Sequence, residues 1–122
     1  MYAVCVYWPF KWKPVVGAII GGIILLSGIV QFFKIVLKKC YIMDQLGINK
    51  FEMHNPYKHI IVGKWIVLID FERCRHVESP KNVSQFVQYI NGTGLFNIDM
   101  ELVKEYKRDM NEKNFKKIMN AL

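Results

Sequence analysis

Residues 59–73 read HIIVGKWIVLIDFER and carry the clearest structural pattern in the chain. Two short apolar runs, HIIV and WIVLI, stand on either side of Gly63 and Lys64. Runs rich in β-branched residues around a two-residue glycine turn are typical of a tight antiparallel hairpin. Asp70 follows directly after the second run. We therefore predict one small β-hairpin whose second strand ends at an aspartate.

The segment before the hairpin has the periodicity of an amphipathic helix. Its apolar side chains recur three or four positions apart and predict one buried face, made of Phe33, Val36, Leu37, Cys40 and Met43. Gly47 is placed to end this helix, because glycine readily takes the left-handed backbone conformation that follows a helix. Residues 48–58 are predicted to form a loop.

The segment after the hairpin is predicted to be helical. Asn82 is the expected N-cap of a helix with an apolar face made of Val83, Phe86, Val87 and Ile90. A further helical pattern begins at Asp99, is interrupted between Asn111 and Asn114, and then resumes. Together the elements predict an α+β fold that is mainly helical and contains one β-hairpin.

Composition and charge limit the class of protein. A chain of 122 residues with 52% hydrophobic side chains has room for one domain and is not disordered or collagen-like. Three widely spaced cysteines predict neither a disulfide framework nor a cysteine metal site. In the C-terminal helices, basic residues alternate with acids, which is typical of a solvated face and predicts no nucleic-acid binding.

A long apolar run lies near the start of the chain. Residues 14–30 read PVVGAIIGGIILLSGIV, and extending the run to residue 33 gives about the length that crosses a bilayer. Lysines flank both ends, and two tryptophans precede the run where an interfacial aromatic belt would lie: Lys11, Lys13, Lys34, Lys38, Lys39, Trp8 and Trp12. We predict a hydrophobic transmembrane helix over about residues 14–33. The alternative is a buried core helix in a soluble, cytoplasmic protein.

The flanking charges and the glycines of this run give two further predictions. The three lysines after the run outnumber the two before it, so the positive-inside rule places the C-terminal part in the cytoplasm of a single-pass membrane protein. Gly17 and Gly21 form one small-xxx-small pair that would allow helix-mediated oligomerisation. We expect residues 1–36 to be an N-terminal segment and residues 37–122 to form the folded domain.

The order helix, acid-containing loop, hairpin and aspartate suits phosphoryl transfer. That reaction needs one carboxylate near the acceptor hydroxyl and a second carboxylate to hold magnesium against the nucleotide phosphates. Glu52 precedes the hairpin and Asp70 follows it. A hairpin that begins after one acid and ends at the other brings both to one end of a site, so these two carboxylates are the candidate pair.

Residues 41–90 also resemble a known family. The stretches MDQLGINKFEMHNPYKHIIVG (residues 43–63), VLIDFERC (67–74) and SPKNVSQFVQYI (79–90) are similar to predicted archaeal serine/threonine protein kinases of the RIO-like and lipopolysaccharide-kinase-like type. The resemblance covers the C-terminal catalytic lobe only. It implies a kinase-like C-lobe fragment, preceded here by the hydrophobic helix.

The resemblance implies roles for four residues and for two cofactors. Asp70 would bind Mg²⁺, and Glu52 would take the position of the catalytic-loop acid. Lys58 and His59 would lie where that loop approaches the ATP phosphates and the second metal site. The implied activity is transfer of a phosphoryl group from ATP to a serine or threonine of a protein substrate.

The sequence departs from the kinase pattern at several positions. Lys50 stands where a histidine is expected two residues before the catalytic acid, and His59 replaces the metal-binding asparagine. No glycine-rich phosphate loop and no V-A-I-K-like lysine precede Glu52. We therefore expect a truncated catalytic lobe that is weakly active or inactive alone, and a separate partner lobe would have to supply the missing parts.

A second interpretation involves no catalysis. The chain would be a small single-pass membrane protein whose cytoplasmic domain acts in assembly or binding. Gly17 and Gly21 would then matter to function, whereas Asp70 would not.

Overall fold

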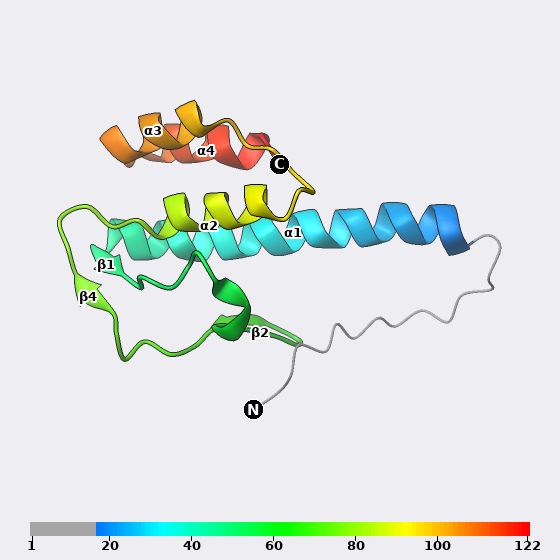
Figure 1. Ribbon diagram of the computed structural model, residues 1–122, viewed down its shortest axis with the longest axis horizontal. Helices are drawn as coiled ribbons and strands as arrows, with labels where there is room; N and C mark the ends of the chain where they lie inside the picture. The colour runs from blue at the N-terminus through cyan, green and yellow to red at the C-terminus, as the bar shows by residue number, and fades with distance from the viewer. Residues whose placement is uncertain (1–16) are drawn as a thin grey trace.

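The computed structural model describes the backbone of residues 17–122 and the side chains of residues 22 and 24–122. The elements in chain order are α1 (Gly17–Gln45), β1 (Ile48–Asn49), the 3-10 helix η1 (Pro56–Lys58), β2 (Ile60–Val62), β3 (Ile66–Leu68), β4 (Arg75–His76), α2 (Asn82–Gly92), α3 (Met100–Arg108) and α4 (Glu112–Asn120). The fold is α+β and mainly helical, as predicted. In Figure 1, α2 lies along the C-terminal half of α1, the pair α3 and α4 lies beyond α2, and the β2–β3 hairpin lies on the other side of α1.

Helix α1 forms the long axis of the fold and has the predicted buried face. Every residue of that face is at least nine-tenths buried, and Val36, Leu37 and Cys40 are fully enclosed. These side chains pack against the apolar face of α2, which is also buried as predicted. The helix ends as expected, because Gly47 adopts a φ of 70° and its N–H donates to the Asp44 carbonyl at 3.1 Å.

The last part of the expected transmembrane segment belongs to the folded core. Phe33 is 5% exposed, and its ring meets the rings of Phe86 and Phe96 edge-on at centroid distances of 6.0 Å and 5.8 Å. Helix α1 also continues unbroken across the expected boundary at residue 36. Within the described part of the chain, no helix combines the length and the apolar character that a bilayer crossing requires.

Several features of the membrane prediction lie outside the described residues. These are residues 14–16, the two preceding lysines and tryptophans (Lys11, Lys13, Trp8 and Trp12), and the side-chain surroundings of Gly17 and Gly21. Membrane insertion and helix-mediated oligomerisation therefore stay predictions.

The β-hairpin is present, with a longer turn than predicted. Val62 pairs with Ile66, so three residues rather than two connect the strands, and the Gly63 N–H donates to the Trp65 carbonyl at 3.2 Å. A second antiparallel pair joins β1 to β4, with Ile48 opposite His76. The prediction of a continuous loop over residues 48–58 is therefore wrong at β1 and at η1.

Helix α3 begins where the sequence indicates, but α4 begins at Glu112, inside the interruption predicted for residues 111–114, and the cap of α2 also differs. Asp99 caps α3 by accepting the Glu101 N–H at 2.9 Å, and Asn111 caps α4 by accepting the Asn114 N–H at 2.8 Å. Asn82 was the predicted cap of α2, and this is wrong. Its side chain points to the C-terminal end of α1, where it joins a buried polar network.

This network, formed by Asp44, Asn82 and Tyr106, fixes three helices to one another. Asp44 is 5% exposed, and its Oδ1 accepts the backbone N–H of Asn82 at 3.1 Å and the side-chain amide of Asn82 at 2.8 Å. Its Oδ2 accepts the Tyr106 hydroxyl at 2.9 Å. Since Asp44 is on α1, Asn82 on α2 and Tyr106 on α3, the Asp44–Asn82–Tyr106 network sets their relative positions.

Tyr106→Phe gives a pH-dependent test of this network. At pH 7 the variant loses one buried hydrogen bond, and its free energy of unfolding should fall by about 1 kcal/mol. Burial, followed by the neighbouring Asp44 carboxylate, raises the pKa of the Tyr106 phenol far above 10.0 in the folded chain. The unfolded chain releases this proton near pH 10, so the stability that neutral Tyr106 contributes is present below pH 10 and is lost above it.

Above pH 10, the free energy of unfolding that neutral Tyr106 contributes should fall by about 1.4 kcal/mol per pH unit. The wild-type advantage over Tyr106→Phe should therefore shrink above pH 10 and reverse near about pH 11, as measured by urea unfolding between pH 8 and 11. The exposed Tyr57, replaced by Phe, is the matched control and should show no such reversal. A Tyr106→Phe difference that stays constant with pH would contradict the buried phenol.

Candidate functional site

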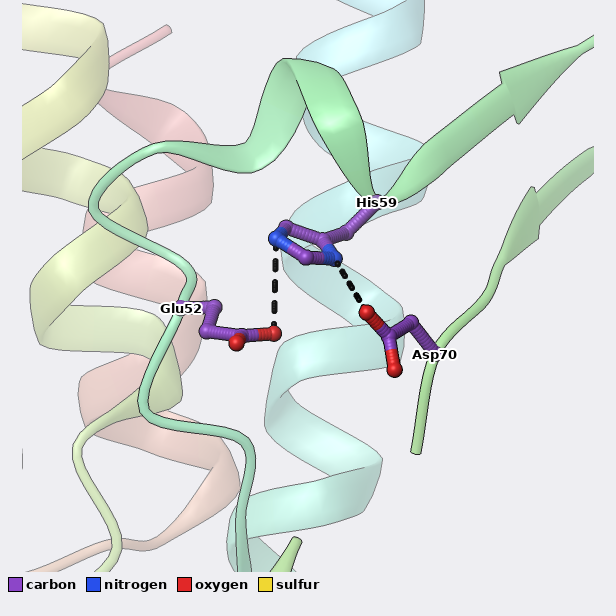
Figure 2. A group of neighbouring side chains, drawn as sticks. All are labelled: Glu52, His59 and Asp70. Carbon is purple, nitrogen blue, oxygen red and sulfur yellow. Dashed lines mark ion pairs between the residues drawn. The ribbon is translucent and has the colours of Figure 1, made fainter. Parts of the chain in front are cut away.

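Three of the residues that the sequence singled out converge at the open end of the hairpin. Glu52 comes from the loop after β1, His59 from the junction of η1 and β2, and Asp70 from the segment after β3. Figure 2 shows the His59 ring between the two carboxylates. Each residue offers one ligand atom, and these atoms lie within 4.8 Å of one another. We call this group the Glu52–His59–Asp70 cluster.

The two nitrogens of the His59 imidazole ring face different carboxylates. His59 Nε2 is 3.3 Å from Glu52 Oε2, and His59 Nδ1 is 3.5 Å from Asp70 Oδ2. His59 is 14% exposed and Glu52 is 19% exposed, whereas Asp70 is 46% exposed. The cluster is thus half enclosed, and Asp70 forms its solvent-facing side.

The strand pairing explains why His59 and Asp70 meet. The Ile69 N–H donates to the His59 carbonyl at 2.9 Å, which continues the hairpin one step beyond Ile60 and Leu68. His59, which precedes β2, is therefore held beside Ile69 and Asp70, which follow β3. Spacing along the chain predicted this convergence for Asp70 and Glu52.

Lys50 contacts two members of the cluster, Glu52 and Asp70, and the sequence did not predict this. It is fully buried, and its Nζ donates a hydrogen bond to the Asp70 backbone carbonyl and lies 3.7 Å from Glu52 Oε2. The ammonium is also 4.9 Å from the centre of the Phe71 ring, within cation–π range. A buried charge is tolerated only when it is paired, so this lysine offsets the Glu52 carboxylate and fixes the backbone of Asp70.

The Asp44–Asn82–Tyr106 network positions this lysine. The Lys50 backbone N–H donates to Asn82 Oδ1 at 2.9 Å, and the Asn82 amide also donates to the Ile48 carbonyl at 2.6 Å. Met53 is fully buried on the other side of Glu52. The acid-bearing loop is therefore anchored on both sides of Glu52.

Two residues of the site have a strained backbone. Phe51 has φ 60° and Asp70 has φ 65°, both in the left-handed region. This region is unfavourable for any residue with a Cβ atom, and most of all for a bulky one such as phenylalanine. Such strain tends to occur at functional sites, where the surrounding structure enforces it. Phe51 lies between Lys50 and Glu52 in the chain, and Asp70 is a member of the cluster itself.

Two buried polar atoms of the cluster have no hydrogen-bond partner among the described residues. They are Glu52 Oε2 and His59 Nδ1. Buried polar atoms are nearly always hydrogen-bonded, and these two have only the ion-pair contacts of 3.3 Å and 3.5 Å described above, so each can still take a ligand. Carboxylate oxygens and imidazole nitrogens are ligands of divalent cations such as Mg²⁺ and Mn²⁺. A cation bound beside Asp70 would satisfy His59 Nδ1, whereas Glu52 Oε2 faces the other ring nitrogen.

Lys58 lies apart from the cluster. It is exposed on η1, and its Nζ is 5.7 Å from the centre of the Tyr57 ring. Another basic side chain, which the sequence did not single out, lies closer to the cluster. Arg73 Nη1 is 3.7 Å from Glu52 Oε1. The Arg73 side chain is 82% exposed, so packing does not fix its position.

No protein-family model matches this chain, and no curated protein is significantly similar to it. The kinase resemblance of residues 41–90 therefore stays a prediction. The geometry of the Glu52–His59–Asp70 cluster and the quoted sequence stretches together support the functional proposal.

Proposed function

We propose that this chain is part of the catalytic lobe of a kinase-like phosphotransferase and that the Glu52–His59–Asp70 cluster binds the magnesium ion that accompanies ATP. The observation that carries this proposal is the convergence of Glu52, His59 and Asp70 within 4.8 Å of one another. They come from the three segments in which the resemblance places the catalytic acid and the metal ligands.

Asp70 is the metal ligand in this proposal. Mg²⁺ prefers few protein ligands and keeps several water molecules, so a half-exposed carboxylate suits it better than a closed cage. Asp70 is 46% exposed, and its backbone is fixed by Lys50 and by the pairing of Ile69 with His59. The ion, when bound, neutralises charge on the phosphates of the nucleotide.

Glu52 is the residue that orients the acceptor hydroxyl and accepts its proton. It is one side chain away from Asp70, with His59 between them. The ammonium of Lys50 lies 3.7 Å from the Glu52 carboxylate and holds it in place. His59 offers a nitrogen ligand where kinases use an amide oxygen, and its Nδ1, 3.5 Å from Asp70 Oδ2, can share a cation with that carboxylate.

Catalysis by this chain alone is expected to be weak or absent. Phosphoryl transfer depends mainly on positioning of the nucleotide, and the sequence has no glycine-rich phosphate loop. We therefore assign the metal and acid positions to this chain, which would bind Mg·ATP through the ion, and assign the alignment of the nucleotide for transfer to a partner lobe. Serine or threonine hydroxyls of a protein are the proposed acceptors.

Replacement of His59 by alanine tests the metal site directly. Binding of Mn²⁺, followed by its electron paramagnetic resonance signal, should weaken at least about tenfold in His59→Ala, because one of the two proposed protein ligands is lost. Lys58→Ala is the matched control. It changes the adjacent residue, which lies outside the cluster, and should leave Mn²⁺ affinity within about twofold. Equal affinities in both variants and the wild type would refute the proposed ligand set.

A further inference from the structure

An apolar groove runs between α1 and the β2–β3 hairpin, and neither Glu52 nor Asp44 lines it. Its volume is about 850 Å³, and it is lined by Leu25, Gly28, Ile29, Gln31, Phe32, Ile35, Lys39 and the hairpin residues 62–67. Three of the large apolar side chains that line it are conspicuously open to solvent: Leu25 is 54% exposed, Trp65 is 73% exposed and Val67 is 46% exposed. A contiguous apolar surface of this kind marks an interaction site.

The charges around the groove have one sign. Lys39 and Lys64 are the charged residues that line it, and the lining contains no acid among the described residues. Lysine stems can lie along apolar surface while the ammonium groups reach an anionic layer, as they do at membrane interfaces. Trp65 sits at the tip of the hairpin beside Lys64, and tryptophan next to lysine is the composition of an interfacial anchor.

The groove is continuous with the apolar run of the sequence. Leu25, Gly28 and Ile29 belong both to the groove and to residues 14–30, which contain no charged side chain. Figure 1 shows that the N-terminal half of α1 extends beyond α2, and the groove joins residues of this half, Leu25 and Gly28, to Trp65 of the hairpin tip. The hairpin tip and the exposed part of α1 can therefore meet the same flat surface.

We infer that the hairpin tip, Gly63–Trp65, and the adjoining groove dock onto the surface of an anionic lipid bilayer. Trp65 enters the interface between headgroups and acyl chains, and Lys64 and Lys39 contact anionic headgroups. This inference is independent of the metal site, since it uses the opposite end of the hairpin from His59 and Asp70.

The test uses the full-length protein with Trp8→Phe and Trp12→Phe, which leave Trp65 as the only tryptophan. The vesicles contain phosphatidylcholine with or without phosphatidylglycerol, and the lipid acyl chains are brominated to quench tryptophan at the interface. We expect strong quenching of Trp65 with the anionic vesicles. Lys64→Glu in the same background should weaken docking of the tip on the anionic vesicles by about fivefold or more, since each basic residue near an anionic surface adds to the binding free energy.

Lys113→Glu is the matched control, because it makes the same charge change on the exposed side of α4. It should leave the quenching unchanged. Vesicle binding without quenching of Trp65 would overturn the inference, because the apolar run would then anchor the chain while the hairpin stays in water. Equal quenching by zwitterionic vesicles would also overturn it. Protection of Trp65 from acrylamide without any vesicle would overturn it too, by showing that protein already covers the groove.

Discussion

Asp44→Ala is expected to lower the free energy of unfolding by about 3–5 kcal/mol. The substitution removes the acceptor for two buried side-chain donors, the Asn82 amide and the Tyr106 hydroxyl, and for the backbone N–H of Asn82. Each buried donor left without a partner costs about 1–3 kcal/mol. Urea unfolding followed by far-UV circular dichroism measures the loss.

Glu78→Ala is the control for this prediction. It also removes one carboxylate, but from an exposed position, and should change the free energy of unfolding by no more than about 0.5 kcal/mol. A similarly small effect of Asp44→Ala would show that the Asp44–Asn82–Tyr106 network does not hold the helices together. An intermediate loss in Tyr106→Phe, which removes one donor only, would support the same account.

The helices and the hairpin were predictable because their patterns are local. The burial of Val36, Leu37 and Cys40 follows from a repeat of three and four residues, and the strands follow from short β-rich runs. The strand pair β1–β4 was not predictable, since two residues on each side are too few to show any periodicity.

The candidate site was predictable only in part. Glu52 and Asp70 flank a hairpin, so chain spacing alone indicates that they meet. The role of Asn82 depends on partners 38 and 32 residues away, Asp44 and Lys50, which no local pattern connects. Asn82 before an apolar helix has the sequence of a cap, and its long-range bonds to the end of α1 prevail over that local preference.

Lys50 shows a further limit of reasoning from pattern. By comparison with kinases it is a mismatch, because a histidine is expected there. In the fold it is fully buried, bonds to the Asp70 carbonyl and lies beside Glu52, so it fixes the backbone at Asp70. A lysine in such surroundings is visible only once the three segments are placed together.

The largest functional effect is expected from Asp70→Asn. The amide keeps the shape of the side chain but removes the negative charge that a divalent cation requires, and Lys50 still holds the Asp70 backbone. Affinity for Mg·ATP should fall by about tenfold to a hundredfold. Asp109→Asn makes the same chemical change at an exposed position outside the cluster and should bind as the wild type does.

Isothermal titration calorimetry of Mg·ATP into the full-length protein and into Asp70→Asn tests the central claim most directly. The account predicts a measurable heat of binding for the wild type and for Asp109→Asn, and its loss in Asp70→Asn. No heat in the wild type, or equal heats in the wild type and Asp70→Asn, would contradict the assignment of the Glu52–His59–Asp70 cluster as a nucleotide-associated metal site.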